Sequence, residues 1–289
     1  MNFFKMQGAG NDYVLIEATD KARDWSKLAI EVCDRHYGIG ADSLLVLLPS
    51  KKADFAMRIF DSDGSEAEAC GNGIRCLTRY IFDKNLIDAG VDHILVETAA
   101  GIRSVRIEQH NGILTGIQAN MGKPEFRADT IPISIKSGQP SVVDIKSMLS
   151  YSVHLEGADL RLNLVSMGNP HAVHFCDHPV DEFPLSRVGP KVENLSIFPN
   201  RTNFEVSRVI SRQQIEVRTW ERGVGETLAC GSGACAVAVA ARLHDYTDKK
   251  VDIIVRGGRL QVEWNGSGDV LLSGPAEIVF TGEWPEKPE

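Results

Sequence analysis

Apolar and polar positions alternate in short runs along much of this chain, a pattern typical of half-buried β-strands. Polar, glycine-containing turns separate the runs, as between residues 7 and 12. The pattern therefore predicts many strands, at residues 3–4, 13–16, 43–48, 102–107, 113–119, 162–165, 172–175, 214–219, 251–255 and 270–272.

Three segments instead have the spacing of helices. Residues 24–37 carry apolar side chains at near-helical intervals and reach Gly38, a typical helix stop. Residues 71–85 place their apolar side chains three and four positions apart, on one face. Residues 231–244 are apolar nearly all round, as expected for a helix enclosed by sheet.

The last two predicted helices begin with an internal repeat. The segment EACGNGIRC at residues 68–76 is matched by LACGSGAC at residues 228–235, so that Cys230 stands 160 positions after Cys70. Because each copy follows a Gly/Glu-containing turn and precedes a helix, two related halves are indicated. We expect an α+β fold of two domains, each a barrel-like, mainly antiparallel sheet wrapped around a central helix.

The boundaries of these domains are indicated by breaks in the strand pattern. Gly122, Pro124 and charged residues interrupt it between residues 120 and 131, and a second break falls at 273–275. We expect residues 1–122 plus 275–289 to form the half that carries Cys70, with the last segment returning as a strand. Residues 123–274 are expected to form the half that carries Cys230.

Composition narrows the class of protein. Apolar residues at 43% and charged residues at 24% are ordinary for a globular protein, which argues against disorder, collagen and coiled coil. The formal net charge of −8 disfavours nucleic acid or an anionic membrane as the main partner. Residues 1–17 lack a signal-peptide core, and no apolar run approaches the roughly 20 residues of a membrane span. We therefore expect a cytoplasmic protein.

The repeated cysteines stand where chemistry is favoured. A cysteine just before a helix meets unpaired backbone N–H groups and the positive end of the helix dipole, which together favour thiolate. Glycines beside Cys70 and Cys230 leave room for a ligand carboxylate at the same N–H groups, and Asn72 and Ser232 add side-chain donors. Each helix start is therefore predicted to be reactive and to bind an anion.

Two such thiols suit inversion of an amino-acid α-carbon. If the two halves face one another across a cleft, one thiolate removes the α-proton while the opposing thiol delivers a proton to the other face. The helix N-termini would stabilise charge that moves onto the carboxylate. Neither role needs a metal or pyridoxal phosphate, so no cofactor and no metal are expected.

Other cysteines and histidines fit structural roles better. Without a repeated setting, Cys33, Cys76, Cys176 and Cys235 are interpreted as small buried hydrophobes. The segment from His171 to His178 holds the sole metal-like cluster of the sequence (His171, His174, Cys176 and His178), but no paired CxxC or HExxH spacing supports it. An edge strand is the favoured interpretation.

Several motifs, in order along nearly the whole chain, closely resemble the diaminopimelate epimerase family. They are GAGNDY at 8–13, DGSE at 63–66, CGNG at 70–73, GNPH at 168–171, ERG at 221–223 and CGSGAC at 230–235. The resemblance implies a pseudosymmetric two-domain fold with the active site in the cleft, epimerisation of LL-2,6-diaminopimelate to the meso isomer, no cofactor and a homodimer.

The resemblance also implies a set of site residues around the catalytic Cys70 and Cys230. Substrate-binding positions are Asn11, Asp61, Gly71, Asn72, Asn169, Asn203, Glu221, Arg222, Gly231 and Ser232, while His171 and Glu221 would tune the pKa values of the thiols. Amide and guanidinium donors suit the carboxylates of a substrate that is zwitterionic at both ends. The donors in excess of one carboxylate, Arg222 above all, predict recognition of a second.

Two positions depart from the family pattern. Asp61 stands where asparagine is usual, and a carboxylate there repels a substrate carboxylate unless it is protonated or faces an ammonium. Ser43 stands where glutamine is common. A proline-racemase-like isomerase is the alternative within the same chemistry, although a small apolar substrate would not need the polar set. A thiol redox or metal-binding protein is the remote alternative, because its cysteines would be expected in local pairs.

Overall fold

A computed structural model describes residues 1–19, 23–67, 70–134 and 142–285. The chain divides into two compact units, Met1–Asn120 with Ser273–Glu289, and Met121–Leu272. The sequence pattern predicts these boundaries at 122 and 274. Residues 68 and 69, the start of the first repeat, lie outside the described residues.

Unit 1 is a mixed sheet in the strand order β19-β1-β2-β3-β4-β6-β7-β8. Neighbours are antiparallel except for β2–β3 and β4–β6, which are parallel, and the short β5 pairs with β4. Its elements are β1 (Asn2–Gly8), β2 (Asn11–Glu17), α1 (Trp25–Cys33), β3 (Ser43–Leu48), β4 (Phe55–Asp61), β5 (Glu66–Ala67), α2 (Gly71–Asp83), β6 (His93–Thr98), β7 (Gly101–His110), β8 (Ile113–Asn120) and β19 (Glu277–Glu283).

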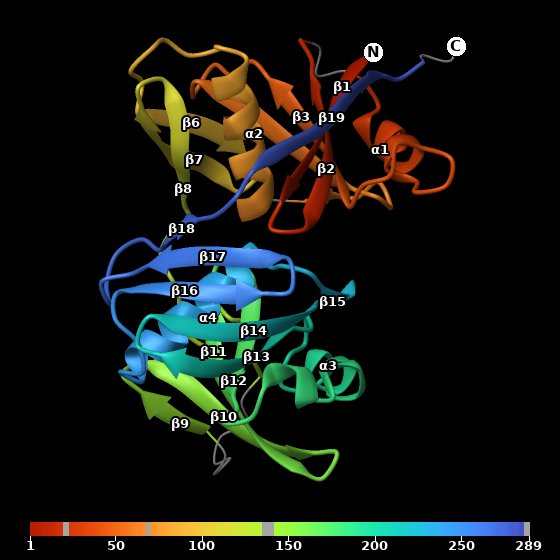
Figure 1. The fold of residues 1–289 in the computed structure, drawn as a ribbon. Helices are drawn as coiled ribbons and strands as arrows, with labels where there is room; N and C mark the ends of the chain where they lie inside the picture. Colours follow the sequence, from red (N-terminus) through yellow and green to blue (C-terminus); the bar gives the residue numbers. More distant parts are fainter. Residues whose placement is uncertain (20–22, 68–69, 135–141, 286–289) are drawn as a thin grey trace. The chain divides into compact units, whose positions relative to one another are not determined.

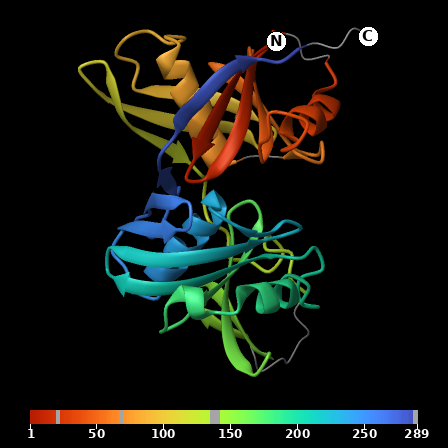
Figure 2. The ribbon, with the colours of Figure 1, turned by 45° about the vertical axis from the view of Figure 1, so that its right-hand side comes forward.

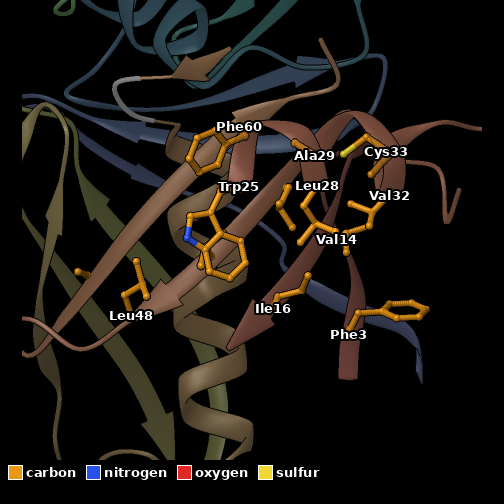
Figure 3. Packing of buried hydrophobic residues seen from close by; sticks show 14 residues of the cluster. Phe3, Val14, Ile16, Trp25, Leu28, Ala29, Val32, Cys33, Leu48 and Phe60 are labelled. Carbon is orange, nitrogen blue, oxygen red and sulfur yellow. The ribbon is translucent and has the colours of Figure 1, made fainter. Parts of the chain in front are cut away.

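Helix α2 is the centre of unit 1 and α1 lies outside the sheet. Figure 1 shows α2 enclosed by the strands, and it contacts β1, β2, β3, β4, β7, β8 and β19. Helix α1 packs on β3 and β4 through the apolar side chains that its sequence spacing places on one face. Figure 3 shows this outer core, in which Trp25, Leu28 and Val32 pack against strand residues such as Val14 and Phe60.

Unit 2 repeats this arrangement in the strand order β9-β10-β11-β12-β13-β14-β16-β17. Here β12–β13 and β14–β16 are the parallel pairs, and the short β15 pairs with β14. Its elements are β9 (Val142–Ile145), β10 (Met148–Leu155), β11 (Ala158–Ser166), β12 (Pro170–Phe175), the 3₁₀ helix η1 (Val180–Glu182), α3 (Leu185–Glu193), β13 (Asn203–Ser211), β14 (Gln214–Glu221), β15 (Gly225–Thr227), α4 (Gly231–Leu243), β16 (Lys250–Val255) and β17 (Gly258–Glu263). The short β18 (Leu271–Ser273) spans the boundary between the units in sequence.

Helix α4 is the centre of unit 2. It contacts β11, β12, β13, β16 and β17, and its residues from Gly233 to Ala241 are almost entirely buried. This enclosure explains why the helix is apolar nearly all round. Figure 2 shows α3 on the outer side of the sheet, where it packs on β13 and β14. A second apolar cluster, which includes Val188, Val192 and Phe204, fills that interface.

The registers of the two sheets make the halves comparable residue by residue. In unit 1 Tyr13 faces Ser43 across the parallel pair β2–β3, and in unit 2 His171 faces Asn203 across β12–β13. Helices α2 and α4 follow β5 and β15 at the same point of each unit. The expected α+β fold with two related, barrel-like halves, each around one central helix, is confirmed.

One predicted helix is shorter than its apolar pattern indicates. Helix α1 begins after Asp24, whose carboxylate accepts the Lys27 N–H at 3.0 Å, but it ends at Cys33 and not near Tyr37. The carboxylate of Asp34 accepts the backbone N–H groups of His36 and Tyr37, both at 2.7 Å, which replaces a further helical turn. Helix α3, which contains Pro190, is not predicted by the sequence pattern. Among the described residues no helix is long and apolar enough to cross a membrane.

Candidate active site

In unit 1, Cys70 is the N-cap residue of α2. Its backbone is extended, with φ of −141°, which turns the thiol back toward the first helical turn. The Gly73 N–H points at the sulfur across 3.4 Å. Sulfur takes the place that a serine or aspartate oxygen has at most helix starts, so the thiol contacts the backbone donors that the sequence predicts for it.

The hydroxyl of Tyr13 is a second neighbour of this thiol. It lies 3.2 Å from Cys70 Sγ. Burial, followed by the proximity of Cys70, raises the pKa of Tyr13 well above its usual range, so the phenol stays protonated and can donate to sulfur. The sequence reasoning uses the GAGNDY motif only for Asn11 and does not identify Tyr13 as part of the site.

Beneath the same helix start lies a buried arginine. Arg75 donates to the Gly71 carbonyl at 3.0 Å and to Asn72 Oδ1 at 2.8 Å, and neither Arg75 nor Asn72 exposes more than 1% of its surface. The Asn72 amide is therefore oriented from below by the guanidinium. Cys76 packs inside the helix, as predicted, and burial raises the pKa of its thiol to about 12.

In unit 2, Cys230 is the N-cap residue of α4 in the same conformation. The Gly233 N–H again lies 3.4 Å from the sulfur, and the Ser232 hydroxyl lies 3.5 Å away. Burial raises the pKa of the Cys230 thiol well above its usual range, and the nearby carboxylates of Glu221 and Glu205 raise it further. The expectation that the helix start favours thiolate is wrong for Cys230, because burial and two carboxylates outweigh the hydrogen bonds from Ser232 and the Gly233 N–H.

Glu221 is a direct neighbour of Cys230. Burial raises the pKa of Glu221, against the effect of hydrogen bonds from Thr227 and Cys230. The Thr227 hydroxyl donates to Glu221 Oε1 at 2.5 Å. The structure therefore brings Glu221 to the thiol that it is predicted to tune, and Thr227 to a supporting position that the sequence does not indicate.

His171 lies in the same unit, fully buried between two acceptors. Its Nδ1 is 2.7 Å from Glu205 Oε1, and its Nε2 is 3.0 Å from Asn169 Oδ1. The amide nitrogen of Asn169 in turn points at Ser232 Oγ across 3.4 Å. A chain of polar groups therefore connects the buried Glu205–His171 pair to the start of α4.

Arg222 belongs to the turn after β14, and Asn203 at the start of β13 contacts this turn. Asn203 donates to the Pro170 carbonyl at 2.9 Å and accepts the Arg222 backbone N–H at 2.9 Å, so its amide ties that turn to β12. The exposed guanidinium of Arg222 donates to the Asn200 carbonyl at 3.2 Å. Within the described part of the chain no carboxylate lies within 4.0 Å of it, so the described residues leave its charge for a ligand.

The two departures from the family pattern contact each other. Ser43 and Asp61 face one another across β3–β4, and the serine hydroxyl donates to Asp61 Oδ1 at 2.9 Å. Burial raises the pKa of Asp61, against that hydrogen bond. Asn11 stands at the start of β2 in the same unit, and its Oδ1 is buried with no hydrogen-bond partner among the described residues.

Each unit thus gathers part of the predicted set. Unit 1 holds Asn11, Asp61, Cys70, Gly71 and Asn72, and unit 2 holds Asn169, His171, Asn203, Glu221, Arg222, Cys230, Gly231 and Ser232. The predicted role of each as a site residue stays a prediction. In the described ranges no three His, Cys, Asp or Glu side chains are grouped as metal ligands.

Known proteins match the chain over its length. A model of the family described as diaminopimelate epimerase matches residues 3–127 and 163–279. Proteins named diaminopimelate epimerase from Acetivibrio thermocellus and Pelotomaculum thermopropionicum are 43% and 42% identical, with 98% and 99% of both chains covered. One from Methanococcus maripaludis is 41% identical over 98% of this chain and 99% of its own.

Solved structures add the fold. A PhzF-family phenazine biosynthesis protein from Bacillus anthracis has a TM-score of 0.72 at 19% identity, with 99% of both chains covered. A probable proline racemase from Agrobacterium radiobacter has a TM-score of 0.70 at 14% identity, with 99% of this chain and 93% of that one covered. These likenesses show the shared two-domain fold, and the sequence matches show the relationship within it: the chain belongs to the diaminopimelate epimerase family and is an isomerase.

Proposed function

We propose that this protein epimerises LL-2,6-diaminopimelate to meso-diaminopimelate without a cofactor, in the supply of lysine and of a peptidoglycan precursor. Family membership supports the substrate. The observation that carries the chemistry is the duplicated helix start, in which Cys70 and Cys230 cap α2 and α4 with sulfur 3.4 Å from a backbone nitrogen. Two equivalent thiols with donors beside them suit one carbon that must lose a proton and regain it.

The proposed reaction uses one thiolate and one thiol in each turnover. The thiolate takes the α-proton, the electron pair moves onto the carboxylate, and the other thiol then gives its proton to the opposite face of the carbon. The base becomes a thiol and the acid becomes a thiolate, so the protein ends ready for the reverse direction. This scheme requires the two units to present Cys70 and Cys230 to one ligand in a cleft.

In the proposed reaction, the two helix starts supply the electrostatic stabilisation of the substrate carboxylate. Backbone N–H groups at Gly71–Gly73 and Gly231–Gly233 would hold the carboxylate of the reacting centre, whose charge grows as the α-proton leaves. The Ser232 hydroxyl and the oriented Asn72 amide add donors at the same places. Preformed donors of this kind stabilise developing charge without reorganisation, which replaces the electron sink that a cofactor provides elsewhere.

The distal end of the substrate is assigned to polar residues of both units. Arg222, without a carboxylate partner in the described ranges, would bind the second carboxylate, and Asn11 and Asn169 would add amide contacts. A proline-racemase-like activity has no comparable support, because the likeness to that family is one of fold. We assign the protein to the cytoplasm and to a homodimer, for which exposed Val279 and Phe280 on β19 offer an apolar contact.

The test is solvent exchange at the α-carbon. Protein treated with a chelator is incubated in deuterated water with LL-diaminopimelate, L-lysine or L-proline, and the α-proton signal and the diastereomer ratio are followed by NMR. We expect deuterium at an α-carbon of diaminopimelate together with the meso isomer, and no exchange of lysine or proline. Exchange of proline at a comparable rate would replace the proposal with its racemase alternative, and absence of exchange in any substrate would end both.

A further inference from the structure

Glu205 is a buried carboxylate to which the proposed mechanism gives no role. It stands on β13, two residues after Asn203, and its side chain is fully buried. Oε1 accepts from His171 at 2.7 Å, whereas Oε2 is buried with no hydrogen-bond partner among the described residues. A buried carboxylate with an unsatisfied oxygen is costly, so its presence calls for a reason other than packing.

The fold itself does not require a carboxylate at this position. In unit 1 Leu45 comes two residues after Ser43, just as Glu205 comes two residues after Asn203, and the registers of β2–β3 and β12–β13 make the two positions equivalent. The contacts of the glycines at the two helix starts show that Leu45 and Glu205 occupy equivalent positions. A Cβ on Gly73 would meet Leu45 Cδ2 at 3.0 Å, and a Cβ on Gly233 would meet Glu205 Oε1 at 2.7 Å. One half of the molecule places an apolar side chain under its helix start, and the other places a charge there.

The hydrogen bonds around His171 connect Glu205 to the start of α4. Both ring nitrogens face oxygens, Nδ1 the carboxylate and Nε2 the Oδ1 of Asn169, whose amide nitrogen is directed to Ser232. These contacts therefore fix the orientation of the His171 ring between Glu205 and Asn169.

This arrangement acts on the Cys230 sulfur by two routes. Among the described residues, the charges that disfavour its thiolate form most are those of Glu221 from β14 and Glu205 from β13. His171 from β12 contacts Glu205 and also acts on Glu221. Through Asn169 the same pair orients the Ser232 hydroxyl, which lies 3.5 Å from the sulfur.

Building on the proposed acid/base role of Cys230, we propose that Glu205 is a positioning residue of that site. It holds His171 and, through it, the Asn169 amide, and its charge keeps Cys230 in the thiol form before substrate binds. It does not touch the reacting atoms. Because Leu45 occupies the equivalent position in unit 1, the effect is confined to Cys230, and the two thiols are made unequal by a residue that lies beneath one of them.

The first experiment measures the thiols without substrate. Glu205→Gln keeps the shape and removes the charge, and Glu205→Leu installs the side chain of the equivalent position in unit 1. Alkylation by iodoacetamide is followed at Cys230 and Cys70 separately, by peptide mass spectrometry between pH 6 and about 10. At a pH below the titration, both variants should alkylate Cys230 several-fold to about tenfold faster than the parent, since tenfold corresponds to one pKa unit. Cys70 should be unchanged.

Controls separate this role from a structural one. Glu216→Gln removes a carboxylate of the same unit that pairs with Arg208 at the surface, and it should leave both profiles unchanged. A Glu205 variant that melts at a lower temperature but keeps the parent alkylation profile at Cys230 would show Glu205 to be structural and would overturn the proposal. The alkylation profile needs no turnover, so it tests the role of Glu205 even if the epimerase assignment is wrong. Loss of exchange activity in a Glu205 variant neither supports nor contradicts that role.

A second measurement uses the unmodified protein and so does not depend on any variant folding. The ¹⁵N chemical shifts of the His171 ring, assigned with a His171→Gln variant, report which nitrogens carry protons. We expect a protonated Nε2 near neutral pH, in keeping with its contact to Asn169 Oδ1. A ring with an unprotonated Nε2 would contradict the contact of His171 with Asn169 Oδ1 and, with it, the proposed action of Glu205 through His171.

Discussion

The two helix starts share a backbone and differ in the side chains around the sulfur. In both, an extended cysteine caps the helix and a glycine N–H lies 3.4 Å from sulfur. Around Cys70 the neighbour is the phenol of Tyr13, while around Cys230 the neighbours are Ser232 and the carboxylates of Glu221 and Glu205. The repeat therefore preserves the backbone donors at each sulfur. The side chains from the neighbouring strands, which set the proton affinity of each thiol, differ between the two units.

This difference has a chemical use in the proposed reaction. An inverting pair needs one base and one acid at the same pH, and two thiols in identical surroundings would supply that combination only in part of the population. Carboxylates beside Cys230 bias it toward the acid form, whereas Tyr13 can donate to Cys70. The two helix starts have the same backbone conformation, but their different side-chain surroundings favour a base at Cys70 and an acid at Cys230.

The largest expected effect comes from removal of either sulfur. Cys70→Ala and Cys230→Ala should each lower epimerisation by at least about 10³-fold, within the range for loss of an acid or base at the reacting centre. The two losses should be similar despite the unequal surroundings, because each turnover uses both thiols. Product formation from LL-diaminopimelate, followed by NMR, provides the measurement.

The matched controls are the other helix cysteines. Cys76 and Cys235 lie within α2 and α4 and are fully buried. Cys76→Ala and Cys235→Ala should destabilise the fold, by about 1–3 kcal/mol for the small cavity left, with turnover of the folded protein kept. If all four alanine variants lose activity equally while folded, the distinction between helix-start and interior cysteines is wrong.

The sequence predicts the backbone of both helix starts well, because the residues that determine it are adjacent in the chain. A cysteine followed by Gly-X-Gly and a helix can be read from adjacent residues, and both helices begin at the predicted Gly71 and Gly231. The surroundings of the thiols are not local. Glu205 reaches α4 through strand register, and the sole hint is that it shares a strand face with Asn203, two residues earlier. Burial at Cys230, which reverses the expected direction of its pKa shift, likewise depends on the packed fold.

The next largest effect on turnover is expected at the turns that follow the equivalent strands β4 and β14. The turn after β14 carries Arg222, and the one after β4 carries Ser62. Arg222→Lys should lower kcat/KM for diaminopimelate by roughly 10- to 100-fold, because an ammonium cannot form the planar, two-pronged contact with a carboxylate. Arg259→Lys, an exposed arginine that pairs with Asp252, serves as the control. Unchanged kinetics of Arg222→Lys would remove the distal carboxylate from this turn.

A smaller, pH-dependent effect is expected at Asp61, which ends β4 as Glu221 ends β14. Burial raises the pKa of Asp61, so this carboxyl is neutral at low pH and becomes charged as the pH rises through the raised value. If it faces a substrate carboxylate, KM should increase a few-fold over that interval. Asp61→Asn should remove the increase, and Ser43→Gln with Asp61→Asn should keep it removed. A KM that falls with pH would instead place an ammonium at Asp61.

The smallest expected effect compares the third residue of each helix. Gly73→Ala and Gly233→Ala both gain helix propensity, about 0.5–1 kcal/mol, so propensity alone predicts equal stabilisation. The neighbours differ. The new Cβ at residue 73 meets the far end of Leu45, which can rotate, at 3.0 Å, while that at residue 233 meets Glu205 Oε1, held by His171, at 2.7 Å. Gly73→Ala should therefore be near neutral in thermal unfolding.

Gly233→Ala should be destabilised by about 1–3 kcal/mol, the usual cost of overpacking. The combination of Gly233→Ala with Glu205→Leu sharpens this comparison, because it gives α4 the apolar neighbour that α2 already has. If the contact with the fixed carboxylate causes the loss, the combined variant should recover most of the stability lost in Gly233→Ala, as measured by denaturant unfolding. Additive effects of the two substitutions would show that Glu205 and Gly233 do not interact, and that the two helix starts differ for another reason.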